Sequence, residues 1–208
     1  MALTDYAGLK QEVIAFTGRD DLSDRFNTFL SLAEAKIYRT NSDRTLRVRE
    51  MEASYALQTV AGTNSIALPA DLLELRTVKI EYGGSKLELT YISPSSINEY
   101  DSGMPTQFTI KGGNLVFNVI PDGVYDLTID YYALPAALSS SNQTNAILTA
   151  YPDVYLFACM ASVYDYTTEP ELSQFSMQKA QASIAGAMKA NERAIRKIPS
   201  AKVSGATP

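Results

Sequence analysis

The 208-residue sequence contains no histidine, no tryptophan and a single cysteine, Cys159. Without histidine there is no Ser–His–Asp or Cys–His catalytic arrangement, no imidazole metal ligand and no side chain that ordinarily titrates near neutral pH. One cysteine permits neither an internal disulfide nor a cysteine-based zinc site. We therefore expect no metal ion and no cofactor, and Cys159, on an apolar run without a neighbouring base, is expected to be a small core residue.

Long apolar runs are also missing. The longest, around residues 154–163, is too short to span a bilayer. Residues 1–13 lack the charged-then-apolar pattern of a signal peptide. These features predict a chain that is made and folded in a cytoplasm without membrane contact. The isoelectric point near 4.8 argues against a general nucleic-acid binder.

Charge is unevenly distributed along the chain. Residues 51–150 hold four basic and ten acidic side chains, a net charge of −6. Residues 1–50 hold eight of each, and residues 151–208 hold six basic and five acidic side chains. The negative charge therefore lies almost wholly in the middle of the chain.

Apolar side chains recur every three or four positions at both ends of the chain, the spacing of a helix face. We expect one helix ending at Gly18 and a second beginning near Ser23. A third, over residues 152–166, is apolar nearly all round and should be central. A fourth continues to Pro199 and would be roughly 40 Å long at about 1.5 Å per residue. Its expected apolar stripe is Leu172, Phe175, Ile184, Met188 and Ile195.

From about residue 53 to residue 133 the apolar period changes to two, which is typical of strands with one apolar and one polar face. The glycine pairs at 83–84 and 112–113 separate such runs and predict hairpin turns. The strand after the first pair is expected to continue through Tyr91. This pattern favours an antiparallel sheet or sandwich.

The order of helices, strands and helices predicts an α+β fold. We expect residues 1–50 and 145–198 to form one domain, a helical bundle. Residues 51–138 would be an inserted, sandwich-like antiparallel β domain, and residues 199–208 a flexible tail.

No catalytic constellation stands out. Asp71 with Glu74, and Glu99 with Asp101, are candidate carboxylate pairs, but acidic residues at turns are more often solvated or capping. Glu88, Glu99 or Asp101 would be the functional residues if the β domain were a module that binds or hydrolyses cell-wall glycans. That function stays open as the alternative.

Two groups of basic side chains follow predicted helices. The simplest interpretation is a solvated surface, which also suits a helix C-terminus because of its dipole. The functional interpretation is salt bridges to the acidic middle of an identical neighbour, packed head to tail around a ring. The residues expected at such an interface are Glu34, Arg39, Arg44, Arg47, Arg49, Lys189, Arg193, Arg196, Lys197 and Lys202.

Several short motifs, in order, resemble the head-to-tail adaptor proteins of tailed bacteriophages, also called connector proteins or tail accessory factors. Residues 29–39 contain the triplet Leu-Ala-Glu before an aliphatic residue and an arginine, and residues 66–76 resemble a second element of that family. The resemblance extends from about residue 4 to residue 197. Its further pieces are Gly103–Pro105, Phe108–Ile110, Val119–Pro121, Thr144–Asn145 and Tyr151–Asp153.

The resemblance implies a structural virion protein and no enzyme. Such adaptors bind as a ring, typically of twelve copies, beneath the portal, where they extend the DNA channel and dock the next tail component, a nozzle or tube. Helices 4–42 and 152–198 would form the ring body and the portal contact, and residues 53–133 would face the distal component. Viral DNA would pass through the lumen without sequence-specific binding. The protein would lie in the neck of the virion after assembly in the bacterial host cytoplasm.

Overall fold

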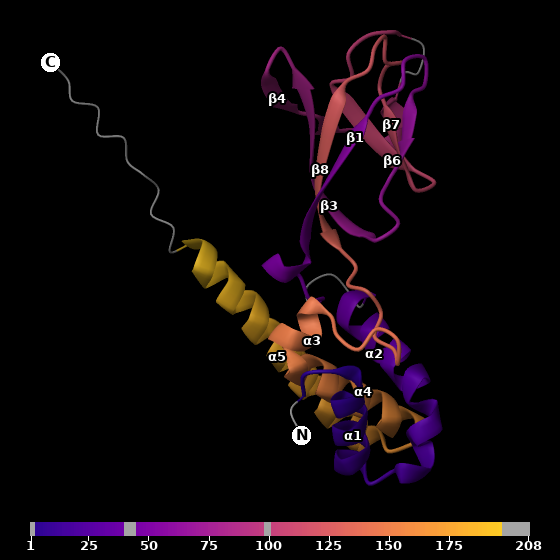
Figure 1. Ribbon diagram of the computed structural model, residues 1–208, viewed down its shortest axis with the longest axis vertical. Helices are drawn as coiled ribbons and strands as arrows, with labels where there is room; N and C mark the ends of the chain where they lie inside the picture. The colour runs from indigo at the N-terminus through magenta and orange to yellow at the C-terminus, as the bar shows by residue number, and fades with distance from the viewer. Residues whose placement is uncertain (1–2, 40–44, 98–100, 197–208) are drawn as a thin grey trace, which may run out of the picture. The chain divides into compact units, whose positions relative to one another are not determined.

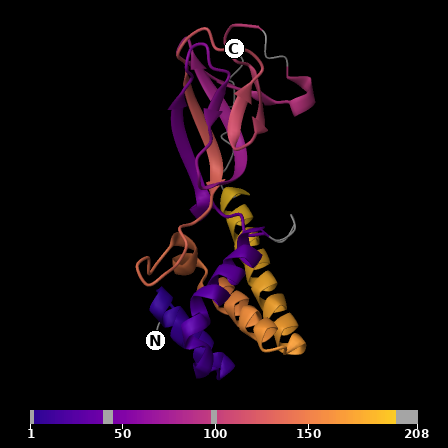
Figure 2. The same cartoon turned by 90° about the vertical axis from the view of Figure 1, so that its right-hand side faces the viewer.

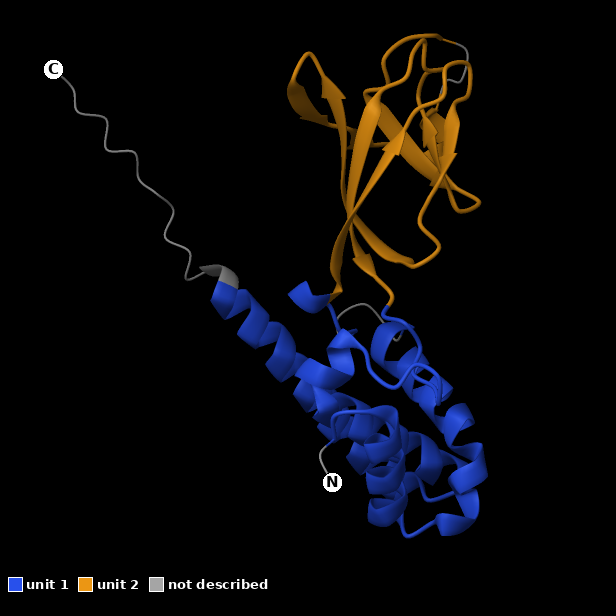
Figure 3. Cartoon of the chain, viewed as in Figure 1, with its two compact units in different colours: residues 1–50, 135–208 blue, residues 51–134 orange. Residues whose placement is uncertain are grey.

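The computed structural model describes residues 3–39, 45–97 and 101–196. It divides into two compact units (Figure 3). Residues Met1–Glu50 and Pro135–Pro208 make up the first, here called the helical unit, and Met51–Leu134 make up the second, the sandwich unit. The structure is a mixture of helices and antiparallel sheets, which confirms the predicted α+β class.

The helical unit is built from two N-terminal and three C-terminal α-helices, with a 3₁₀ turn between the first two (Figure 1). They are α1 (Tyr6–Thr17), η1 (Asp20–Arg25), α2 (Phe26–Arg39), α3 (Ala146–Ala150), α4 (Pro152–Tyr166) and α5 (Pro170–Arg196). None of the described helices is long and apolar enough to cross a membrane.

Helix α4 lies at the centre of this unit. Ten of its fifteen residues are buried, and it packs against α1, α2 and α5. The predicted start at Pro152 and end at Tyr166 are confirmed. A helix that is apolar all round can be stable only where neighbours cover every face, so the composition of α4 sets its position.

The two N-terminal helices follow their sequence signals closely. The Asp5 carboxylate accepts a hydrogen bond of 2.7 Å from the Gly8 N–H at the start of α1, and Gly18 ends the helix at φ 65°. The predicted α-helix near Ser23 instead begins as the 3₁₀ turn, and α2 starts at Phe26. Its whole apolar stripe is buried: Phe26, Phe29, Leu30, Ala33 and Ile37.

Helix α5 corrects the predicted stripe. Leu172 and Phe175 are 44% and 56% exposed. The buried side chains of the helix are mostly small, namely Ser173, Ser176, Ala180, Ile184 and Ala187. Small side chains let α5 approach α4 closely, and the two helices lie side by side (Figure 2). The bulky residues are therefore displaced to the solvent face, where the Lys179 ammonium lies 4.7 Å from the centre of the Phe175 ring.

The sandwich unit contains two four-stranded sheets. Their strand orders are β1-β8-β3-β4 and β2-β7-β6-β5. All neighbours are antiparallel except β5 and β6, which are parallel. The strands are β1 (Glu52–Gln58), β2 (Ser65–Ala67), β3 (Leu72–Tyr82), β4 (Ser85–Glu88), β5 (Thr90–Tyr91), β6 (Gln107–Lys111), β7 (Asn114–Phe117) and β8 (Asp126–Ala133). Two short 3₁₀ turns, η3 (Arg49–Met51) and η4 (Pro94–Ser96), precede β1 and follow β5.

The inner faces of both sheets supply one apolar core. Alternate residues of β3, β6, β7 and β8 enter it, as the period of two predicts, whereas the residues of β4 and β5 are exposed. Its buried members are Val78, Ile80, Leu89, Phe108, Leu115, Phe117, Leu127, Ile129 and Tyr131.

The chain changes sheets where the sequence pattern predicts one continuous strand. The turn at Gly83 and Gly84, both at positive φ, forms the expected hairpin. However, β4 ends at Glu88, and Thr90–Tyr91 pairs with β6 of the other sheet. Leu89, between them, donates its N–H to the Val78 carbonyl and buries its side chain in the core. The alternation of apolar and polar residues continues from β4 into β5. The periodicity of the sequence therefore does not reveal that the chain changes sheets here.

Candidate interaction surfaces

The described residues contain no group of three or more histidine, cysteine or acidic side chains that could hold a metal ion. Cys159 is fully buried in α4, and burial raises the pKa of its thiol well above the ordinary value. A buried, protonated thiol is a poor nucleophile. As predicted, it is a small core side chain.

The basic side chains after α2 have different surroundings. Arg39 is exposed, and Arg47 is half-buried with its guanidinium donating to the Leu46 carbonyl at 2.8 Å. Arg49 is exposed and pairs with Glu50 at 3.0 Å. Glu50 also accepts from the Tyr151 hydroxyl at 3.2 Å, which links this segment to α4. Arg44 lies outside the described residues.

The basic side chains of α5 lie beyond its packed part. Ala187 is the last residue of the helix that is buried among those whose side chains are described, and Lys189 and Arg193 are exposed. Arg196 is the last residue of the helix, and Lys197 and Lys202 lie outside the described residues. The described cations of this end therefore project from a stretch of helix in which no described side chain is buried.

Glu34 differs from the other predicted interface residues because it is half-buried. It accepts hydrogen bonds from the Leu138 N–H at 3.2 Å and the Tyr155 hydroxyl at 3.4 Å. Desolvation, the largest influence, raises the pKa of its carboxyl. The Tyr155 hydroxyl also contacts the Tyr38 hydroxyl at 2.8 Å and the Asn145 amide nitrogen at 2.9 Å. This buried network, which sequence reasoning missed, holds the segment around Leu138 against α2 and α4.

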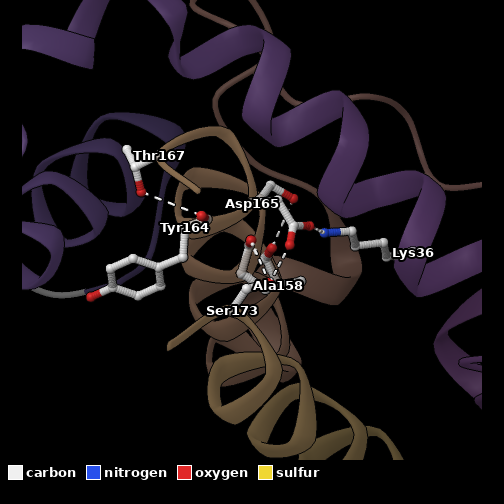
Figure 4. Close-up of polar contacts among 8 residues, drawn as sticks. Lys36, Ala158, Tyr164, Asp165, Thr167 and Ser173 are labelled. Carbon is white, nitrogen blue, oxygen red and sulfur yellow. Dashed lines mark hydrogen bonds and ion pairs between the residues drawn. The ribbon is translucent and has the colours of Figure 1, made fainter. Parts of the chain in front are cut away.

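A second polar cluster joins three helices (Figure 4). The Lys36 ammonium of α2 lies 2.6 Å from the Asp165 carboxylate of α4. The Ser173 hydroxyl of α5 donates to the same carboxylate and lies 3.1 Å from the Ala161 carbonyl. Burial alone would raise the pKa of Asp165, but the hydrogen bonds from Lys36 and Ser173 and the lysine charge outweigh it, so the pKa is lowered.

This cluster fixes helix positions. Ser173 is 7% exposed, and its hydroxyl is engaged with an acceptor. A buried serine hydroxyl that faces a carboxylate and a carbonyl has no route to a substrate. The arrangement therefore stabilises the packing of α2, α4 and α5.

The outer face of the first sheet carries a polar cleft of about 400 Å³. Asp130 lies at its centre and accepts hydrogen bonds of 2.5 Å from Ser54, 2.9 Å from Thr77 and 2.7 Å from Lys79. The Lys79 ammonium is the main cause that lowers the pKa of Asp130 to about 2. Asp130 is therefore ionised at neutral pH and cannot serve as a proton donor.

Arg76 completes the charge pairing in this cleft. Its guanidinium lies 2.6 Å from Glu52 and 5.2 Å from the centre of the Tyr132 ring. Both cations of the cleft are thus matched by carboxylates. Such a surface suits contact with a polar partner and offers no activated nucleophile.

The candidate carboxylates that the structure describes have separate hydrogen-bond or strand partners. Asp71 accepts from the Tyr131 hydroxyl at 3.0 Å, and Glu88 is exposed on β4 opposite Lys79. Asp101 is exposed, and its backbone carbonyl accepts from the Ile120 N–H at 2.7 Å. Glu99 lies outside the described residues.

Comparison with known proteins identifies the chain by its family. No curated protein matches it. The family model described as SU10 adaptor protein matches residues 4–206, a range that includes parts of both the helical and the sandwich unit. This match bears out the resemblance to phage adaptors and implies a structural virion component. The chain belongs to the SU10 adaptor protein family of bacteriophages.

Proposed function

We propose that this protein is a head-to-tail adaptor that assembles as a ring, of twelve copies, beneath the portal of the DNA-filled head. There it extends the DNA channel and docks the next tail component, a nozzle or tube. The observation that carries the proposal is the family match over residues 4–206, because it includes parts of both units. The role is structural, and assembly takes place in the host cytoplasm.

The charge distribution supports contacts between copies. The sandwich unit has four basic and ten acidic side chains, and the remainder of the chain has a net charge of +1. An acidic surface on one copy can attract Lys189 and Arg193 of another, both of which are exposed. An acidic lumen would also let DNA pass, because phosphate binding depends on basic contacts.

The helical unit supports a contact with the portal. Helix α5 has 27 residues, and its described side chains after Ala187 are not buried. Lys189 and Arg193, exposed on this part of the helix, are accessible to another protein. We propose that the helices carry the portal contact together with the segment after Pro199, and that the sandwich unit faces the distal component.

Electron microscopy of the protein mixed with its portal tests this function. We expect rings bound to the portal and co-migration of the two proteins in sedimentation. The double variant Lys189→Glu/Arg193→Glu should bind the portal at least tenfold more weakly than the wild type, because both cations become anions. Lys111→Glu, an exposed charge reversal in the sandwich unit, is the matched control and should bind like the wild type.

Failure of the wild-type protein to co-migrate with its portal would contradict the proposal. A monomer in the absence of portal would not, because the portal can act as the template for the ring. Equal binding by the double variant and the control would remove Lys189 and Arg193 from the interface.

A further inference from the structure

The strand β1 is an exposed edge without the features that usually protect one. It pairs with β8 over all seven residues without a register shift, and it has no second strand neighbour among the described residues. Its stretch Ala53–Gln58 contains no charge and no proline. Tyr55, at its centre, is 47% exposed. Edge strands of natural proteins usually carry charges, prolines or bulges that prevent pairing with a strand of another chain. An edge strand without these features is therefore a site for strand addition.

The opposite edge of the same sheet is β4, and the hairpin of β3 and β4 carries exposed apolar side chains. Tyr82 and Leu87 are 57% and 44% exposed, although they continue the alternation of the buried Val78 and Ile80. The reason is that the chain leaves this sheet after Leu89, so the hairpin of β3 and β4 extends away from the second sheet (Figure 1). Its apolar face is only partly covered by described residues, since the Tyr82 ring contacts the Tyr125 ring at 6.3 Å between centroids.

The two edges match in direction. Within the sheet β1, β8, β3 and β4 alternate in direction, so β1 and β4 run in opposite senses. A second copy placed beside the first with its strands in the same sense brings its β1 antiparallel to β4. The antiparallel pattern of the sheet then continues across the junction.

The two edges also match in the faces they present. Leu87 pairs with Ile80, Ile80 with Leu127, and Leu127 with Leu57 on β1. Leu57 and Tyr55 are two residues apart on one strand, so Leu87 and Tyr55 belong to the same face. Joining the edges would place their apolar side chains together and their polar side chains on the other face.

We propose that β4 of one copy adds to β1 of the next, so that the first sheets of neighbouring copies become continuous around the ring. The proposal rests on the proposed function because it names the contact within that ring. Use of two different edges makes the contact head-to-tail, which allows closure into a ring, whereas pairing of one edge with itself would stop at a dimer.

Cross-linking of assembled rings tests this contact. Ala56→Cys on β1 and Lys86→Cys on β4 replace exposed residues of the polar face, and the native Cys159 is buried. The reagent is a bismaleimide that spans about 8 Å, the separation of diagonal neighbours on adjacent strands. On the portal, the double variant should give a covalent ladder beyond the dimer, and each single variant should remain monomeric on a denaturing gel.

If the double variant forms rings on the portal but gives no covalent ladder, the proposed strand contact is wrong, whereas the adaptor function is not contradicted. Dimers from either single variant would also overturn it, because they would show that an edge pairs with itself. Absence of rings from every sample, including the wild type, would overturn both the contact and the function on which it rests.

A second variant pair checks the contact without cysteine chemistry. Tyr55→Lys adds a charge to the β1 edge and should raise the protein concentration needed for half-maximal ring formation at least tenfold. Val124→Lys, a substitution at a 64% exposed apolar residue outside the strands, should not. Equal thermal midpoints would show that both variants fold. Equal ring formation by the two would overturn the proposal.

Discussion

Asp130 shows how one side chain organises a polar surface. It lies opposite Ser54 on β1 and Thr77 on β3, and it accepts hydrogen bonds from both and from the Lys79 ammonium. Three side chains from the two strands that flank β8 are therefore held by one carboxylate. A charged acceptor with several donors contributes more than a neutral one, and loss of its charge weakens all of these bonds together.

Asp130→Asn should lower the free energy of unfolding by about 1 to 2 kcal/mol at pH 7. Because the folded-state pKa is about 2, below the ordinary 3.8, the contribution is fully present above about pH 4 and is lost as the pH falls through 2. Urea unfolding at pH values from 2 to 7 measures it. The wild type should lose stability more steeply than the variant between pH 4 and pH 2.

Asp126→Asn is the matched control for this substitution. Asp126 lies on the same strand, is exposed and accepts a side-chain hydrogen bond from Gln58 at 2.7 Å. Its replacement should change the unfolding free energy by less than about 0.5 kcal/mol. Identical results for the two variants would show that the cluster around Asp130 does not stabilise the fold.

The long helix shows how packing at the scale of an element differs from a hydrophobicity pattern. Helix α5 covers α4 with Ser173, Ser176 and Ala180 and leaves Phe175 exposed. The close approach of two helices needs small side chains between them, and the Ser173 hydroxyl is satisfied by Asp165 and the Ala161 carbonyl. A search for large apolar residues therefore selects the wrong face for the first half of this helix.

Ala180→Leu should destabilise the helical unit by about 1 to 3 kcal/mol, because the fully buried methyl group has no room for a larger side chain. Ala182→Leu, two positions along on the exposed side, should change stability by less than about 0.5 kcal/mol. Circular dichroism during thermal unfolding measures both. Equal midpoints would mean that α4 and α5 are not closely packed at Ala180.

At the scale of the whole molecule, the sandwich unit is a contiguous piece of chain with its own core. Its two ends are neighbours, because Glu52 at the start of β1 pairs with Tyr132 near the end of β8. A module whose ends lie together can be inserted between helices without altering the path of the chain on either side. The expected domain division stays a prediction, and the two units can be tested separately.

A fragment of residues 51–134 should fold by itself and unfold in one cooperative transition, because the residues of its core cluster all belong to this part of the chain. The remaining chain, with the module replaced by a short glycine–serine linker, should keep its helical circular dichroism. Calorimetry of the fragment and of the full chain provides the measurement. A fragment without a transition would show that the sandwich depends on the helices.

The sequence by itself determined the α+β class, the end of α1 at Gly18, the bounds and central position of α4, and the turns at the two glycine pairs. These depend on local periodicity, on turn residues such as Gly18 and on the apolar composition of a single helix, all of which act over a few neighbouring residues. The motifs along the chain also sufficed to indicate the adaptor family that the comparison then showed.

Only the tertiary structure decided which polar and apolar groups meet. The Tyr155 network and the Asp165 cluster join residues more than 100 positions apart, and the change of sheets at Leu89 leaves the alternating pattern unaltered. Contacts of this kind depend on how complete elements pack, which local sequence does not encode. For the same reason the exposure of Tyr55 and Leu87, from which the strand contact between copies is inferred, became visible only in the folded sheet.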